Sequence, residues 1–62
     1  MKLRVAIAGF GSVGQRRYFF LKKKKFFNVV AISDQYIQYR KKFKHGKVYN
    51  DYQKMLKEEQ ID

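Results

Sequence analysis

The sequence predicts an α/β fold in which strands and helices alternate as β-α-β-α-β-α around a three-stranded parallel sheet with flanking helices. Two apolar runs of strand length carry this prediction, Leu3–Ala8 and residues 28–33. The residues between them follow helical spacing, and strand, helix and strand in that order make a right-handed parallel unit. The 62 residues leave room for one such unit but not for a complete doubly wound domain.

The strands are expected over residues 2–8, 28–33 and 47–49. The first run is almost continuously apolar, which is typical of a strand buried on both faces. Such a strand is expected at the centre of a complete sheet. In this chain by itself, its outer edge is expected to be free.

A glycine-rich turn links the first strand to the first helix. Its pattern, G-x-G-x-x-G, runs over Gly9, Phe10, Gly11, Ser12, Val13 and Gly14. In dinucleotide-binding (Rossmann) domains the first glycine allows the tight turn, the second lets backbone approach a pyrophosphate, and the third lets helix and strand pack closely. Asp34 lies twenty positions beyond Gly14, where such domains place the acid that accepts hydrogen bonds from the adenosine ribose. The alternative is an ordinary tight turn with an exposed aspartate.

The first helix is predicted to begin at Ser12. Its core-facing side is expected to carry three apolar residues with two more at the border: Val13, Phe20 and Leu21, bordered by Gly14 and Tyr18. Arg17 falls within that arc. It either extends along the helix to water or meets an anion, which would be a carboxylate or a cofactor.

A second, shorter helix is predicted after Asp34. Tyr36, Tyr39 and Phe43 share one of its faces and are expected to pack on the sheet. The helix is expected to stop at His45-Gly46, with Gly46 in the left-handed conformation.

A last helix is predicted after the third strand, with Asn50 or Asp51 as its cap. Its apolar stripe is expected to consist of Tyr52, Met55 and Leu56.

The net charge of +10 is concentrated in two lysine runs, residues 22–25 and Lys41, Lys42 and Lys44. Both runs fall toward the ends of predicted helices, where solvated cations are favoured. The alternative is a surface for nucleic acid or an anionic membrane, with aromatic side chains beside the lysines: Phe19, Phe20, Phe26 and Phe27.

Composition argues against several other classes. The chain has no cysteine, so neither a disulfide framework nor a thiolate metal site is expected. A single histidine, His45, and five scattered carboxylates do not predict a metal cluster. No stretch approaches the roughly 20 apolar residues of a membrane span, so the cytoplasm is the expected location.

The order of these pieces resembles the N-terminal part of the Gfo/Idh/MocA oxidoreductases, named after glucose-fructose oxidoreductase, inositol dehydrogenase and a rhizopine-catabolism protein. The resemblance covers essentially the whole chain and rests on residues 3–17, 29–34, 48–52, 55–56 and 61–62. The glycine motif is also similar to that of homoserine dehydrogenase. The segment Val48-Tyr49-Asn50-Asp51-Tyr52 favours the sugar-oxidoreductase family instead.

The resemblance implies an oxidoreductase that uses NAD, or NADP, to act on a sugar or polyol. It implies that Asp34 holds the adenosine ribose and that the turn binds pyrophosphate through Gly9, Phe10, Gly11, Ser12, Val13 and Gly14. No catalytic residue carries over, because the family's Glu-Lys-Pro segment, its catalytic lysine or histidine and its substrate domain have no counterpart here. Residues 1–62 are therefore expected to be a truncated, cofactor-binding portion.

Two other classes stay open. One is a free-standing nucleotide-binding module, and the other is a small basic nucleic-acid-binding protein, for which the sequence shows charge but no recognition motif. Asp34 predicts a preference for NAD over NADP, because its carboxylate repels a 2′-phosphate, although Arg40 nearby could soften that preference. The isolated chain is expected to be marginally stable and to self-associate through the edge of Leu3–Ala8.

Overall fold

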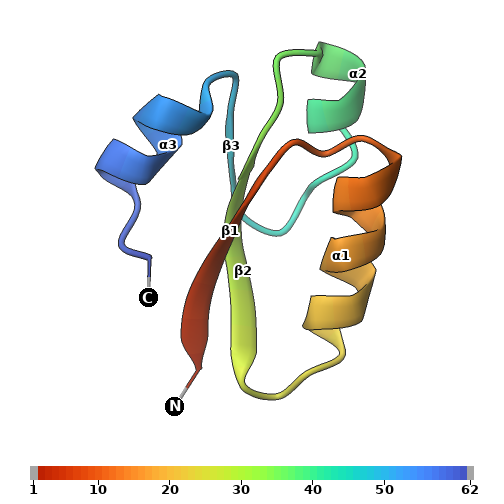
Figure 1. The fold of residues 1–62 in the computed structure, drawn as a ribbon, viewed down its shortest axis with the longest axis vertical. Coiled ribbons are helices and arrows are strands. Elements are labelled where there is room, and N and C mark those ends of the chain that lie inside the picture. The colour runs from red at the N-terminus through yellow and green to blue at the C-terminus, as the bar shows by residue number, and fades with distance from the viewer. Residues whose placement is uncertain (1, 62) are drawn as a thin grey trace.

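The computed structural model describes residues 2–61, in which strands and helices alternate (Figure 1). The elements are β1 (Leu3–Ala8), α1 (Ser12–Lys22), β2 (Phe27–Ser33), α2 (Ile37–Arg40), β3 (Lys47–Tyr49) and α3 (Tyr52–Glu58). The strands form one parallel sheet in the order β1-β2-β3. The predicted fold class, element order and parallel sheet are confirmed.

β2 is the central strand of this sheet, and β1 is an edge strand. β1 pairs with β2 from Leu3 opposite Phe27 to Ala8 opposite Ser33, with one register shift after Val5. The first strand, expected at the centre of a complete sheet, thus has a partner strand on one side only among the described residues. No described strand pairs with its outer edge, as expected for this chain.

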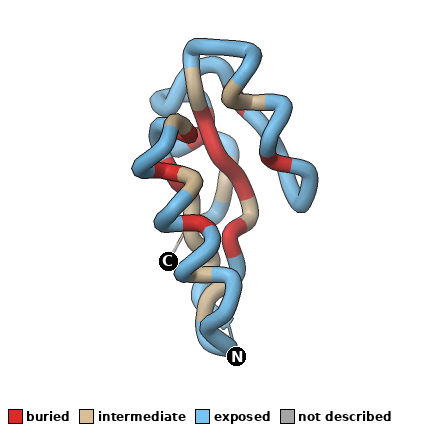
Figure 2. Tube along the Cα trace, turned by 90° about the vertical axis from the view of Figure 1, so that its right-hand side faces the viewer, coloured by how far each residue is buried: buried red, intermediate tan, exposed pale blue. Residues whose placement is uncertain are grey.

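The two faces of the sheet carry separate apolar clusters, one under α1 and one under α3 (Figure 1). The cluster on the α1 side consists of Ile7, Phe10, Tyr18, Val29, Ile32 and Phe43. The cluster on the α3 side consists of Ala31, Tyr49 and Met55. Figure 2 shows that burial is concentrated along the inner strand, whereas the loops at both ends of the molecule are mostly exposed.

The face that α1 turns toward the sheet differs from the predicted one. Gly14 and Tyr18 are buried, whereas Val13 and Phe20 are 60% and 63% exposed. Leu21 is half-buried against the core. The predicted arc is wrong because α1 packs over β1 and β2, so side chains on its outer flank extend past the edge strand and meet no further strand.

The segment after β2 is less helical than predicted. α2 spans only Ile37–Arg40, so Phe43 lies beyond it, although its side chain is buried in the α1-side cluster. Gly46 does not have the left-handed conformation, because Gly9 is the one glycine with positive φ among residues 2–61. A Cβ on Gly46 would instead overlap the carbonyl oxygen of Val30, so glycine is needed there for close approach to β2.

Asp51 caps α3, as predicted, because its Oδ1 accepts a hydrogen bond of 2.8 Å from the backbone N–H of Gln53. The predicted stripe is only partly correct. Met55 is buried, but Tyr52 and Leu56 are more than half exposed. Met55 packs with Ala31 of β2 and Tyr49 of β3, whereas Tyr52 and Leu56 lie outside that cluster.

None of the described helices has the length and apolar character needed to cross a membrane. Residues 2–61 contain no group of three or more side chains that could together hold a metal ion.

Candidate nucleotide-binding site

The glycine turn lies where β1 ends and α1 begins, at the carboxyl edge of the sheet. Gly9 adopts a φ of 92°, which only glycine enters easily. Its N–H donates a 2.7 Å hydrogen bond to the carbonyl of Ser33, the last residue of β2. The turn is therefore fastened to the central strand as well as to its own strand.

The other two glycines of the motif have different surroundings. A Cβ on Gly14 would overlap the carbonyl oxygen of Gly9, so only glycine lets α1 pack this closely against the turn. A Cβ on Gly11 would meet no atom within 4 Å, so the space beside Gly11 is open. These two positions correspond to the packing and ligand-approach roles expected of the third and second glycines.

The first turn of α1 offers hydrogen-bond donors beside that open space. Gly11 is the N-cap residue, and no side chain caps the helix. The N–H groups of Ser12, Val13 and Gly14 precede the first intrahelical bond, which runs from Gln15 N to Gly11 O at 2.9 Å. Such donors, together with the helix dipole, favour an anion at this point.

Asp34 connects the carboxyl end of β2 to the glycine turn. Its Oδ2 accepts a 2.7 Å hydrogen bond from the N–H of Phe10, and its Oδ1 accepts one of 2.9 Å from Tyr36 N–H. Its own N–H donates to Tyr49 O of β3, and Arg40 Nη1 donates to its carbonyl at 2.8 Å. The carboxylate is half-buried and fixed in direction, with lone pairs left for further donors.

The role of Phe10 in this arrangement differs from the one expected from the sequence. Its N–H, implied by the resemblance as a pyrophosphate donor, is directed at Asp34 instead. Its side chain is 1% exposed and packs edge-on against Tyr18 and Phe43, with ring centroids 5.9 and 5.6 Å apart. Phe10 therefore supports the site from the core, a role that the motif by itself does not indicate.

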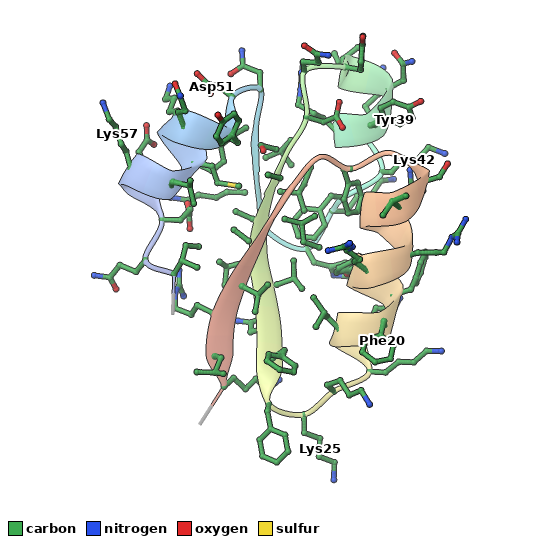
Figure 3. The ribbon with its side chains drawn as sticks, viewed as in Figure 1. Phe20, Lys25, Tyr39, Lys42, Asp51 and Lys57 are labelled. Carbon is green, nitrogen blue, oxygen red and sulfur yellow. The ribbon has the colours of Figure 1, made fainter. Side chains whose placement is uncertain are left out.

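Two hollows flank the turn. One, of about 750 Å³, lies over the carboxyl ends of the strands and is lined by Asp34, Tyr36, Tyr39, Asn50, Asp51 and Tyr52, among others. Figure 3 shows Tyr39 and Asp51 at this end of the molecule. The other, of about 680 Å³, lies between β1 and α1 and includes Gly11, Ser12 and Arg17. Each of them falls within the range of about 300–1,000 Å³ that is typical of small-molecule sites.

The sequence predicted that Tyr36 and Tyr39 pack on the sheet. Tyr39 is half-buried against the α1-side cluster, as predicted, whereas Tyr36 is not, and the position of both tyrosines beside the first hollow was not predicted. Tyr36 is 52% exposed, and its ring lies 6.1 Å from that of Tyr39 in an edge-on contact. A signal existed, because residues that follow strands of a parallel sheet gather at its carboxyl edge, where ligands bind.

A second polar group lies away from this edge and is structural. Glu59, with a side chain 5% exposed, accepts a 2.5 Å hydrogen bond from Tyr49 Oη and lies 3.6 Å from Arg4 and 3.8 Å from Lys47. The hydrogen bond to Glu59, with burial, raises the pKa of Tyr49 to about 12. The sequence reasoning placed Glu59 in a polar helix end, because nothing local indicates these distant partners.

The fold and site define a class of protein rather than a family. The class is an α/β unit with a partial Rossmann-like parallel sheet and a glycine turn at its carboxyl edge. No protein-family model, curated protein or solved structure matches the chain.

Proposed function

We propose that the chain binds a dinucleotide, NAD in preference to NADP, across the glycine turn. The observation that carries the proposal is the position of Asp34, whose carboxylate is held against the turn while Gly11 and the start of α1 remain open. The pyrophosphate would accept hydrogen bonds from Ser12 and Val13 N–H, and Asp34 would accept them from the adenosine ribose. Bound NAD would supply the hydride-accepting nicotinamide.

The larger activity follows from the sequence resemblance. We propose that this portion serves a Gfo/Idh/MocA-like oxidoreductase that acts on a sugar or polyol. The residues described here position a cofactor, and the proposal assigns none of them to proton or hydride transfer.

The direct test is titration of the isotopically labelled chain with NAD, followed by amide chemical shifts. Saturable shifts are expected at Gly11, Ser12, Val13 and Asp34, with the N–H of Phe10 perturbed through its bond to Asp34. Amides at the far end of α3, such as that of Lys57, serve as an internal control. Shifts spread evenly over lysine-rich segments, without saturation at the turn, would contradict the proposal.

A further inference from the structure

Charge is distributed unevenly between the two sides of the sheet. Apart from Asp34, the carboxylates of residues 2–61 are Asp51, Glu58 and Glu59, in or beside α3. Three ion pairs lie on that side of the described chain: Arg4–Glu59, Lys47–Glu59 and Lys54–Glu58. Figure 3 shows Lys25 and Lys42 on the α1 side and Lys57 on the opposite, α3 side.

The α1 side presents a basic and aromatic surface, which we call the α1 surface. It comprises Arg16, Arg17, Phe19, Phe20, residues 22–25, Phe26, Lys41, Lys42 and Lys44. Phe19, Phe20 and Phe26 are 52%, 63% and 71% exposed, so most of each ring lies outside the core. Lysines lie over two of these rings, Lys22 Nζ at 4.4 Å from the centroid of Phe19 and Lys24 Nζ at 4.8 Å from that of Phe20.

Each flank of α1 has a hollow that combines an aromatic wall with cations. On one flank, Phe20 and Leu21 form a hollow of about 390 Å³ with Arg16 and Arg17. On the other, Tyr18 and Phe19 form one of about 390 Å³ with three lysines: Lys41, Lys42 and Lys44. Planar rings beside cations are the features that hold a stacked base and its phosphate.

We propose that the α1 surface binds single-stranded nucleic acid, with bases stacked on Phe19 and Phe20 and phosphates on the surrounding lysines. The proposal goes beyond cofactor binding, because none of these lysines or exposed phenylalanines lies in the glycine turn. Consecutive helix residues project about 100° apart, so Phe19 and Phe20 face different flanks of α1. A flexible strand can follow the helix surface and reach both rings. The cations beside each ring favour such a strand, whose phosphates alternate with its bases.

The test is fluorescence anisotropy of the whole chain with labelled oligothymidylate of about 12 nucleotides. An abasic strand of equal length and vesicles containing phosphatidylserine are the comparison ligands. Oligothymidylate should bind more tightly than the abasic strand, and the vesicles should bind weakly. F19S and F20S should each lower oligothymidylate affinity on the order of tenfold while leaving abasic binding unchanged. Both rings are exposed, so circular dichroism should show an unchanged fold.

Two triple variants that lose the same amount of charge distinguish binding at the α1 surface from attraction by the net positive charge of the chain. The first triple variant, in which Gln replaces Lys22, Lys24 and Lys42, should have a slope of log affinity against log salt concentration that is smaller by about two. The second triple variant replaces three lysines on the α3 side by Gln and should leave this slope almost unchanged; the three are Lys47, Lys54 and Lys57. Equal effects of the two triples, equal binding of the abasic strand, or tighter binding to vesicles would each overturn the proposal. At physiological salt, where exposed charges are screened, the NAD shifts at Gly11 should be the same in these variants as in the parent chain, so this proposal and the cofactor proposal can fail separately.

Discussion

At the scale of single residues, the glycine turn contains two positions whose substitution should affect different properties, ligand binding at one and folding stability at the other. Gly11 faces open space at the start of α1, and its φ of −73° suits any residue. Gly14 is in backbone contact with Gly9. The first position therefore serves a ligand and the second serves packing, although both are glycines of one motif.

Gly11→Ala should weaken NAD binding about tenfold, equivalent to about 1.4 kcal/mol, because the new methyl group occupies the space that a pyrophosphate would enter. The effect should persist at all salt concentrations in calorimetric titrations. Replacing the four lysines of residues 22–25 by Gln should affect NAD binding only at low salt, because exposed charges act through a screened long-range term. The reverse ranking would indicate a binder driven by charge.

Asp34→Ala should narrow the difference in affinity between NAD and NADP, because it removes the carboxylate that repels a 2′-phosphate. This change also removes the acceptor for Phe10 and Tyr36 N–H, so Asp34→Asn is the matched variant that keeps an acceptor oxygen. Both variants should lose NAD affinity on the order of tenfold. Unchanged discrimination in Asp34→Asn would count against the assigned role of the carboxylate.

At the scale of elements, two close contacts join the helices to the sheet in addition to the apolar clusters. The turn and α1 are joined where Gly14 meets Gly9, and the end of α3 is joined to β3 where Tyr49 donates to Glu59. One contact depends on the absence of a side chain. The other depends on a buried carboxylate that also lies near Arg4 and Lys47.

Gly14→Ala should destabilise the chain by about 1–3 kcal/mol, because the backbone of α1 must move away from the turn to admit a Cβ. Chemical denaturation measures this loss of free energy of unfolding. Gly11→Ala is the control, since its Cβ meets no atom, and it should change stability much less. Similar losses in the two variants would show that the close approach at Gly14 is not required.

The Tyr49–Glu59 contact should make stability depend on pH. The folded pKa of Tyr49 is about 12, against 10.0 for an ordinary tyrosine, so its contribution is complete below pH 10. Between pH 10 and 12 the unfolded chain loses the proton first, so the contribution falls as pH rises. The free energy of unfolding of Tyr49→Phe should therefore fall less steeply with rising pH across this window than that of the parent chain. Denaturation curves recorded at several pH values measure this difference. Tyr52→Phe, an exposed tyrosine on α3, is the control, and parallel curves for parent and Tyr49→Phe would contradict the assignment.

At the scale of the whole molecule, the outer edge of β1 and the net charge have opposite effects on self-association. Leu3 N–H and Gly9 N–H donate toward β2, so the alternate residues Ala6 and Ala8 direct their backbone groups to the outer edge. Such an edge is a template for another strand, whereas a net charge of +10 keeps copies apart.

Self-association should therefore rise with salt, because the repulsion is screened over about 10 Å at 0.1 M. Sedimentation and thermal melting across salt concentrations test this expectation. Ala6→Pro removes an outward N–H and should reduce association, with circular dichroism confirming that the strand is retained. A monomer at every salt concentration that melts cooperatively well above physiological temperature would show that the unit is self-sufficient.

The sequence by itself determined the alternation of strands and helices, the parallel sheet, the glycine turn and the placement of Asp34 after β2. These features follow from local patterns, because apolar runs, helical spacing and glycine motifs are read within a few residues. The carboxyl ends of parallel strands meet at one edge, which brought Asp34 to the turn without further information.

Only the tertiary structure decided which side chains that framework buries. Phe10 entered the core, Val13 and Phe20 were left on the outer flank of α1, and Glu59 found its partners in other elements. Each outcome depends on which element packs against the side chain, and that element is distant from it in the sequence. The periodicity of α1 is compatible with several rotations about its axis, and the edge position of β1 together with the close contact of Gly14 with Gly9 selected one of them.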